Sequence, residues 1–243
     1  MMKKFVQNCD LITERTLIII LGQLGRSGKA SHILPALFSN PVHNHSASEF
    51  STPFVKVKAL KAYTGGTKEA GHSAVIDQEG NLWVTGCDRW QQLGLGSTVN
   101  GASGYTWKDG RLWQDNFQMN IYLRQLMKTS IRDVAIGGDH TIILSQNQRD
   151  VYSFGKGAEG QLGILRKPFV NGPAHAKELS VKAGARGDKK IASVCAIRHC
   201  SFTLDENNEV MKRVGKCKID KNLLTRAVKD CKEKSIRDGL VDT

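Results

Sequence analysis

Histidines and cysteines are the residues of this chain whose types could support metal or acid–base chemistry. His72 and His140 stand 68 positions apart in similar surroundings, and His199 lies in a third, weaker copy of the same pattern. Cys195 and Cys200 stand close to His199, and zinc prefers thiolate and imidazole ligands. A histidine that recurs at the same position of each copy is more typical of packing than of catalysis. We therefore expect each imidazole to bond neighbouring backbone. Buried cysteine on a strand is also ordinary packing, so we expect no metal and no cofactor.

The other motifs do not predict an enzyme. The glycine-rich stretch from Gly22 to Ser31 is similar to a phosphate-binding loop, but Ala30 stands where that loop needs serine or threonine for magnesium. No Ser-His-Asp elbow, paired carboxylates or metal-ligand spacing stands out elsewhere. We therefore predict no catalytic residues.

An internal repeat explains the glycines better. The core Gln-Leu-Gly occurs three times, and the interval from Leu24 to Leu93 and from Leu93 to Leu162 is 69 residues each time. Gly86 and Gly155 keep the same interval. A fixed period of this kind is the signature of a repeat architecture, in which one structural unit recurs.

Each repeat reads as short strands joined by tight turns. Apolar runs rich in β-branched and aromatic residues are bounded by Gly, Asp and Asn, as in the hairpin phrase Asp77 to Asn81. We expect strands near Ala70–Ile76, Leu82–Thr85, Val134–Ile136, Thr141–Leu144, Val151–Phe154, Ile191–Ala196 and Ser201–Leu204. The insertion from Asn100 to Thr129 mixes aromatic residues with cations, which could stack RNA bases, although packing within the blade is the favoured interpretation.

These residues resemble the repeat of the regulator of chromosome condensation family. The shared pattern is a strand ending near Gly–x–His, a second strand, a hairpin, a strand ending in glycine, and then Gly-Gln-Leu-Gly. The resemblance implies an all-β fold, a partial β-propeller of four-stranded antiparallel blades, because too few repeats are present for the usual seven blades. It implies structural roles for a set of repeated positions, namely His72, His140, His199, Gly86, Gly155, Gly25, Gly94 and Gly163.

The ends of the chain differ from the repeats, which we expect over residues 22–218. Residues 1–21 would be a targeting segment or the remnant of a blade, since few acidic residues occur before position 49, as in a mitochondrial signal. Residues 219–243 predict a basic amphipathic helix, because Leu223, Leu224 and Val228 fall at helical spacing among lysines and arginines. No apolar stretch reaches the ~18–20 residues of a membrane span.

Positive charge is the second strong feature, with a net charge of +12. Such a chain encounters nucleic acid or acidic protein favourably. The candidate polyanion-binding residues stand in the connector after the second repeat and near its third copy: Lys182, Arg186, Lys189, Lys190, Lys212, Arg213, Lys216 and Lys218.

Two functions follow as expectations. The first is a non-enzymatic propeller module, a subunit or scaffold of a large RNA-containing assembly, with protein partners and RNA. The second, implied by the resemblance, is a guanine-nucleotide exchange factor for a Ran-like small GTPase. Sparse, unpaired cysteine spacing indicates a reducing intracellular compartment, the mitochondrion or else the nucleus or cytoplasm.

Overall fold

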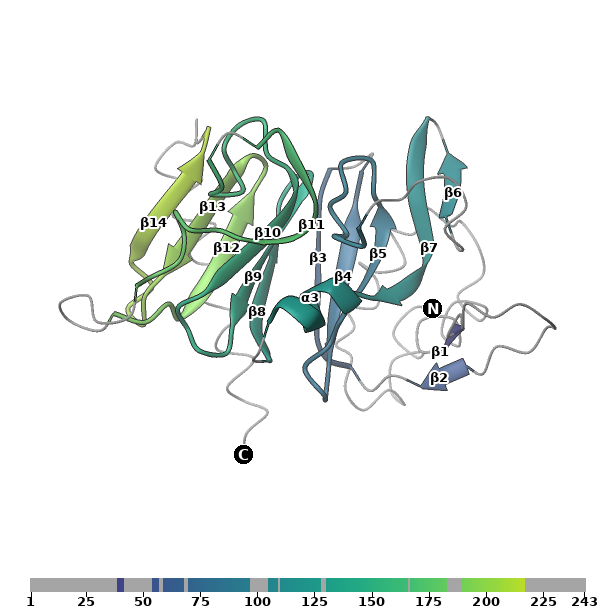
Figure 1. Cartoon of the computed structure of the whole chain (residues 1–243), viewed down its shortest axis with the longest axis horizontal. Coiled ribbons are helices and arrows are strands. Elements are labelled where there is room, and N and C mark those ends of the chain that lie inside the picture. Colours follow the sequence, from purple (N-terminus) through teal and green to yellow (C-terminus); the bar gives the residue numbers. More distant parts are fainter. Residues whose placement is uncertain are drawn as a thin grey trace, which may run out of the picture.

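The computed structural model describes residues 39–41, 54–56, 59–67, 70–96, 105–108, 110–127, 130–165, 167–182 and 189–216. These residues form three successive antiparallel sheets and a separate short pair of strands, β1 (Ser39–Pro41) and β2 (Phe54–Lys56). Figure 1 shows the three sheets side by side in chain order. Gly25 and the predicted C-terminal helix lie outside the described residues.

The first sheet contains five strands in the order β3-β4-β5-β7-β6. Their bounds are β3 (Ala59–Gly65), β4 (His72–Asp77), β5 (Leu82–Cys87), β6 (Tyr105–Lys108) and β7 (Arg111–Met119). The fifth strand, β6, comes from the insertion and forms a tight hairpin with β7, in which Lys108 pairs with Arg111. A short helix, α3 (Ile121–Leu126), follows β7, and its N-cap Asn120 accepts the Leu123 N–H at 2.8 Å.

The second sheet has the predicted four strands, in the order β11-β10-β9-β8. They are β8 (Ile131–Ile136), β9 (His140–Ser145), β10 (Val151–Lys156) and β11 (Phe169–His175). The third sheet has three described strands, β12 (Ser193–Ile197), β13 (Cys200–Leu204) and β14 (Val210–Gly215). Strand β8 contacts β3 on one side and β12 on the other, so the innermost strands of successive blades are neighbours.

Acidic and amide side chains fold the hairpin turns locally. Asp77 Oδ1 accepts the N–H groups of Glu79 and Asn81 at 2.9 and 2.8 Å, and Asp77 Oδ2 accepts from Trp83 Nε1 at 2.8 Å. In the third blade Asp205 repeats the backbone part of this pattern, accepting the N–H groups of Asn207 and Glu209 at 2.9 Å. Each carboxylate thus satisfies turn amides that the strand ladder cannot reach.

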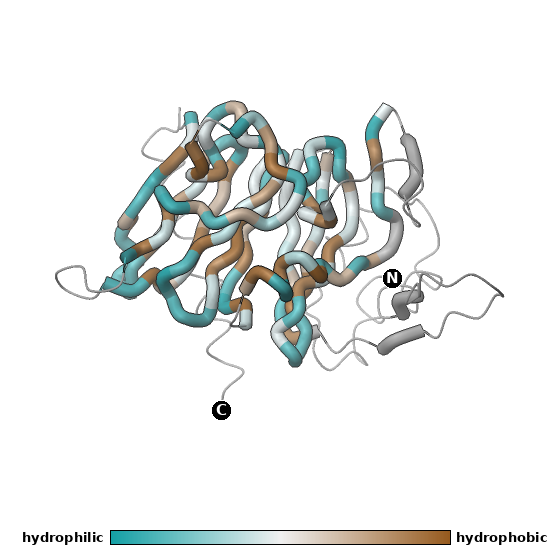
Figure 2. The backbone as a smooth tube through the Cα atoms, in the orientation of Figure 1, coloured by the Kyte–Doolittle hydropathy of each residue, from teal (hydrophilic) through white to brown (hydrophobic). Residues whose placement is uncertain are grey.

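The core lies between the blades. One buried cluster joins the first blade to the second, through side chains such as Ile76, Val84 and Phe154, and another joins the second to the third. Strands β4, β5 and β9 are buried along their whole length because both faces are covered. Figure 2 shows hydrophobic residues gathered along the strands and hydrophilic ones at many turns.

The predicted all-β fold of antiparallel blades is confirmed. The strands end within a few residues of their predicted bounds; for example, the strand expected from Ala70 begins at His72. The insertion contributes two strands and a helix, of which Phe117 and Leu123 are buried while Tyr122 is exposed.

Candidate functional site

The repeated histidine joins neighbouring blades. His72 Nε2 lies 2.9 Å from Thr141 Oγ1 in the second blade, and Thr141 Oγ1 donates to the Gln92 carbonyl at 2.8 Å. His140 Nε2 lies 2.9 Å from Ser201 Oγ in the third blade, and this hydroxyl donates to the carbonyl of Gln161. We call this arrangement the interblade relay: an imidazole of one blade, a hydroxyl of the next blade, and a glutamine carbonyl of the first.

The relay fixes the tautomer of both rings. A threonine or serine hydroxyl has one proton, and here that proton goes to a carbonyl, which can only accept. The imidazole Nε2–H must therefore donate to the hydroxyl oxygen. Burial lowers the pKa of His72 and of His140 to about 3, and for His140 the nearby His72 and His199 lower it further. Both rings are neutral and sealed from solvent, which suits packing and does not suit acid–base catalysis.

Two details of the relay go beyond the sequence prediction. The imidazoles were expected to bond neighbouring backbone, and each of them reaches a hydroxyl in the next blade, which was not predicted. Strand pairing also places Cys200 opposite Gly215, as His140 stands opposite Gly155 and His72 opposite Gly86. His199 is therefore one residue out of register, because the third blade turns between β12 and β13 through only Arg198 and His199.

The glutamine and glycine positions also hold the turns. Gln92 Oε1 accepts the Trp90 N–H at 2.8 Å, and Gln161 Oε1 accepts the Glu159 N–H at 2.9 Å. Gly94 and Gly163 have φ angles of 64° and 61°.

Gly86 and Gly155 take equivalent positions with φ angles of 109° and 102°, which favour glycine. A Cβ at Gly155 would lie 2.6 Å from the Asp139 carbonyl oxygen. Backbone therefore packs directly on backbone at this position.

A cation crosses each blade junction on the surface. Lys156 Nζ lies 4.9 Å from the centroid of the Trp90 ring, and Lys216 Nζ lies 2.7 Å from Glu159 Oε2. Trp90 and Glu159 stand at matching places, two residues before Gln92 and Gln161. The hydrogen bond from Lys216 holds the pKa of Glu159 below its usual range.

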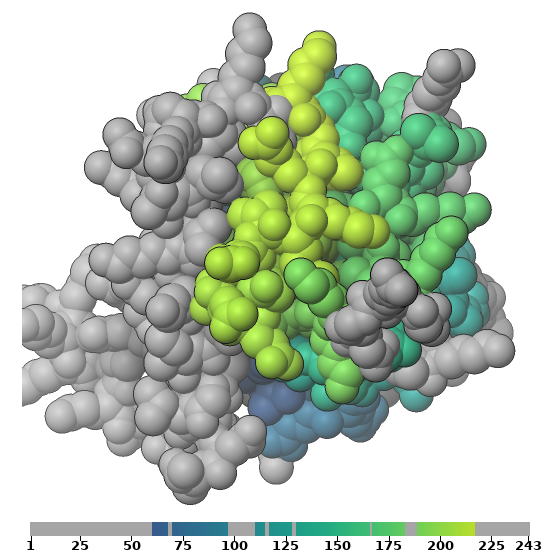
Figure 3. Space-filling view, turned by 90° about the vertical axis from the view of Figure 1, so that its left-hand side faces the viewer, coloured from purple at the N-terminus to yellow at the C-terminus, as the bar shows by residue number. Residues whose placement is uncertain are grey.

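The predicted polyanion-binding residues divide into groups. Lys182, Lys189, Lys190 and Arg213 are exposed, whereas Lys212 is partly buried and its Nζ donates to the Ser180 carbonyl. Figure 3 shows the third blade, with its yellow C-terminal part, at the surface on this side of the molecule.

Lys216, although exposed, is paired with Glu159, and Arg186 and Lys218 lie outside the described residues. The structure therefore leaves four of the eight candidates exposed, and none of the described residues pairs with them.

The cysteines do not form a metal site in the part of the chain that the structure describes. No group of three or more histidine, cysteine, aspartate or glutamate side chains suited to a metal occurs there. Cys195 and Cys200 each take part in a disulfide bond, which differs from the free thiols that the sequence predicted. Cys87 is a buried free thiol, and burial raises its pKa. Within the same residues, no helix has the length and apolar character to cross a membrane.

Comparison with known proteins identifies the repeat. Residues 131–161, from the start of β8 to Gln161, match the regulator of chromosome condensation (RCC1) repeat. The chain is 36% identical over 123 residues to the secretion-regulating guanine nucleotide exchange factor of Bos taurus, and 33% identical over 147 residues to that of Mus musculus. The matches cover 51% and 60% of this chain but only 22% and 25% of those relatives.

Among solved structures, Prp20p from Saccharomyces cerevisiae is similar, with a TM-score of 0.45 and 20% identity over 78% of this chain and 38% of that one. The matched repeat, the similarity to the two exchange factors and the recurrence of the strand pattern on either side of residues 131–161 all point the same way. The chain carries a regulator of chromosome condensation repeat and resembles a partial, divergent member of that family.

Proposed function

We propose that this chain is a propeller interaction module that binds a small GTPase and promotes its guanine nucleotide exchange. The observation that carries the proposal is the 36% and 33% identity to two proteins named as guanine nucleotide exchange factors. This supports the exchange-factor hypothesis better than the RNA-assembly hypothesis, which the sequence had favoured.

The chemistry of the blades agrees with such a role. An exchange factor needs no nucleophile, because it acts by binding one state of its partner more tightly than another. The described histidines at the blade junctions are neutral and buried, so we assign them to packing, and the exposed turns and cations supply contact surface. The matched relatives are several times longer than the matched segments, so exchange by this chain alone is the point to test.

A nucleotide-release assay tests the proposal directly. Purified full chain is added to a panel of small GTPases loaded with a fluorescent GDP analogue, and release is followed in excess GTP. We expect one GTPase to release nucleotide at least about tenfold faster, a change of roughly 1.4 kcal/mol in the release barrier. Release by a magnesium chelator checks that each GTPase is loaded. Absence of both acceleration and a complex with any nucleotide-free GTPase would overturn the proposal.

A second candidate function, binding within an RNA-containing assembly, is favoured by one observation. The chain carries a net charge of +12, and Lys182, Lys189, Lys190 and Arg213 are exposed. Replacing these four residues by glutamine should weaken RNA binding and flatten its dependence on salt, because fewer counterions are released. If the four-residue variant bound RNA as tightly as the parent protein and retained it at high salt, the RNA-binding function would be contradicted.

The compartment stays part of the proposal. An exchange factor of this family would act in the cytoplasm or nucleus, whereas the mitochondrial signal was predicted from residues before position 49. Of those residues the structure describes only 39–41, and the comparisons add nothing in favour of a mitochondrial address.

A further inference from the structure

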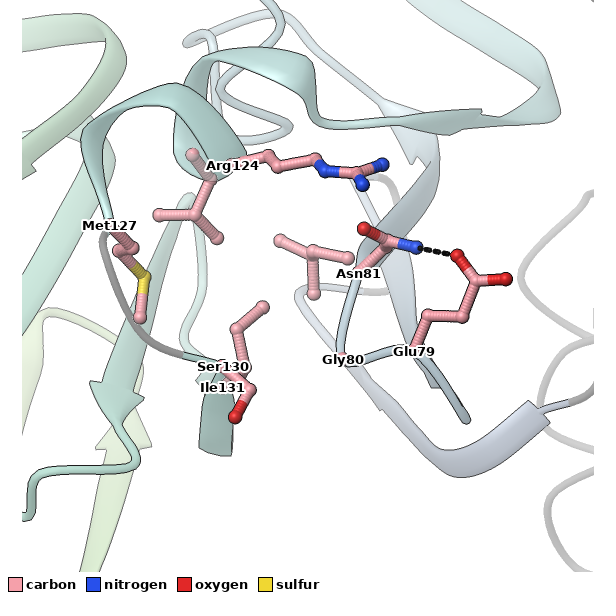
Figure 4. Close-up of a pocket in the computed structure, with 9 residues that line it drawn as sticks. Glu79, Gly80, Asn81, Arg124, Met127, Ser130 and Ile131 are labelled. Carbon is pink, nitrogen blue, oxygen red and sulfur yellow. Dashed lines mark hydrogen bonds between the residues drawn. The ribbon is translucent and has the colours of Figure 1, made fainter.

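A pocket opens at the junction of the first two blades. It has a volume of about 290 Å³ and lies between the β4–β5 turn, helix α3 and the start of β8. Figure 4 shows the lining residues, with Arg124 extending across one side and Met127 and Ser130 on another. The lining is Glu79, Gly80, Asn81, Leu82, Leu123, Arg124, Met127, Ser130 and Ile131.

The second junction is built differently at the equivalent place. There a compact turn that begins at Ala176 takes the place of α3, since the Ala176 N–H bonds the Val151 carbonyl as the Asn120 N–H bonds the Leu82 carbonyl, both at 2.8 Å. Two further backbone hydrogen bonds hold the chain close to the β9–β10 turn. They run from the Ile191 N–H to the Gln148 carbonyl at 2.8 Å and from the Val181 N–H to the Arg149 carbonyl at 2.9 Å.

The insertion contributes to the pocket. At the first junction the Gly80 position approaches Ser130 closely, with 2.8 Å between a Cβ built there and the Ser130 Cβ. Beside this contact, side chains of α3 line the gap. The pocket thus depends on residues of the insertion.

The pocket has an apolar floor and one cation at its mouth. Leu82, Leu123 and Met127 are 1%, 2% and 7% exposed, and they contribute aliphatic and thioether surface. Arg124 is exposed, and none of the described residues pairs with its guanidinium. Glu79, the one acid in the lining, accepts from Asn81 Nδ2 at 3.2 Å, and Figure 4 shows its carboxylate pointing away from the pocket.

Helix α3 also carries exposed apolar side chains. Ile121, Tyr122 and Leu126 are 47%, 45% and 45% exposed, a high exposure for large apolar side chains on six residues of helix. An apolar cavity lined by the same helix, beside a cation with which none of the described residues pairs, fits an acidic peptide with a large apolar side chain.

We propose that this pocket binds an acidic peptide segment of a partner protein, with one large apolar side chain in the cavity and a flanking carboxylate on Arg124. A cavity of about 290 Å³ with an apolar floor has room for one large apolar side chain. The proposal concerns a separate surface and does not rest on the exchange activity.

Methionine methyl NMR on the full chain tests the pocket with defined probes. The chain has five methionines, of which Met127 lines the pocket and Met211 packs at the other junction. The probes are three acetylated and amidated pentapeptides: Glu-Glu-Phe-Glu-Glu, the same peptide with glutamine flanks, and the same peptide with a central alanine. The variant Met127→Leu assigns the Met127 signal by its loss.

We expect the first peptide to shift the Met127 signal and leave the Met211 signal in place. It should bind about two- to fivefold more tightly than the glutamine-flanked peptide, the range for an exposed ion pair. The alanine peptide should not shift Met127. Arg124→Gln should remove the preference for glutamate flanks and keep the shift, while Ser130→Phe should block the cavity and abolish the shift.

Three results would overturn the proposal: no shift of Met127 by any peptide, an equal shift of Met211, or a glutamate preference that survives in Arg124→Gln. Arg124 is exposed and makes no described side-chain bond, so its substitution should leave folding intact, and circular dichroism checks this. The nucleotide-release assay reads a different property, so either proposal can fail alone.

Discussion

Removal of the Thr141 hydroxyl should destabilise the protein through the groups it leaves behind. Thr141→Val keeps the shape of the side chain but breaks two bonds, from His72 Nε2 and to the Gln92 carbonyl. All three residues are at most 1% exposed, so water cannot replace the hydroxyl. A buried polar group without a partner costs about 1–3 kcal/mol, and two such groups predict a loss of about 2–6 kcal/mol in the free energy of unfolding.

The chain offers a matched control for this experiment. Thr203 is also fully buried, on β13 of the third blade, but its hydroxyl has no hydrogen-bond partner. Thr203→Val should therefore be neutral or stabilising, because it removes an unsatisfied polar atom and keeps the volume. Urea unfolding followed by circular dichroism measures both variants, and an unchanged m value shows that the comparison is valid.

A double substitution separates the relay from simple packing. When Thr141→Val is combined with His72→Leu, no imidazole N–H is left without a partner. The double variant should therefore lose less free energy of unfolding than the two single variants together, by about 1 kcal/mol or more. The reasoning would be refuted if the free energy of unfolding of Thr141→Val differed from that of the parent protein by less than about 0.5 kcal/mol, the usual range for a surface substitution. Equal losses for Thr141→Val and Thr203→Val would refute it as well.

Two further predictions concern pH and the backbone. The pKa values of His72 and His140 are about 3 in the folded state against 6.5 ordinarily, so below pH 6.5 the unfolded chain binds more protons and stability falls as pH drops toward 3. The free energy of unfolding from urea titrations should be lower at pH 5 than at pH 7 by about 2 kcal/mol for each ring, and a flat profile would contradict buried neutral rings. Gly155→Ala should lower the free energy of unfolding by more than about 1 kcal/mol, because φ is 102° and a Cβ would lie 2.6 Å from the Asp139 oxygen. Gly172→Ala is the control: its Cβ would meet nothing within 4 Å, so the unfolding midpoint should change little.

The blades could be predicted from the sequence because their local and periodic signals agree. Asp77 and Gly80 mark a hairpin in the sequence and form one in the structure, since the Asp77 carboxylate binds the turn amides. The fifth strand of the first blade was not predicted. No pattern in the insertion distinguishes a strand at Tyr105–Lys108, paired at the sheet edge, from a loop.

The site was harder to predict because its partners are remote in sequence. The signal for the relay was present in Ser73, Thr141 and Ser201, hydroxyl residues that recur directly after the relay position, but periodicity alone does not show which blade they face. The third copy was placed out of register because its histidine stands one residue early. A slip of one residue reverses the face of a strand, so only the pairing of Cys200 with Gly215 settles the register.

The relay gives the second blade two unlike sides. It offers the Thr141 hydroxyl to the blade before it and donates the His140 N–H to the blade that follows, so its two joints are not interchangeable. Blades could therefore be exchanged among relatives, or duplicated by recombination, only if donor and acceptor still met at each new joint. The third blade keeps the acceptor, Ser201, but carries Cys200 in place of the donor, so a blade attached behind it would need another means of being held in register.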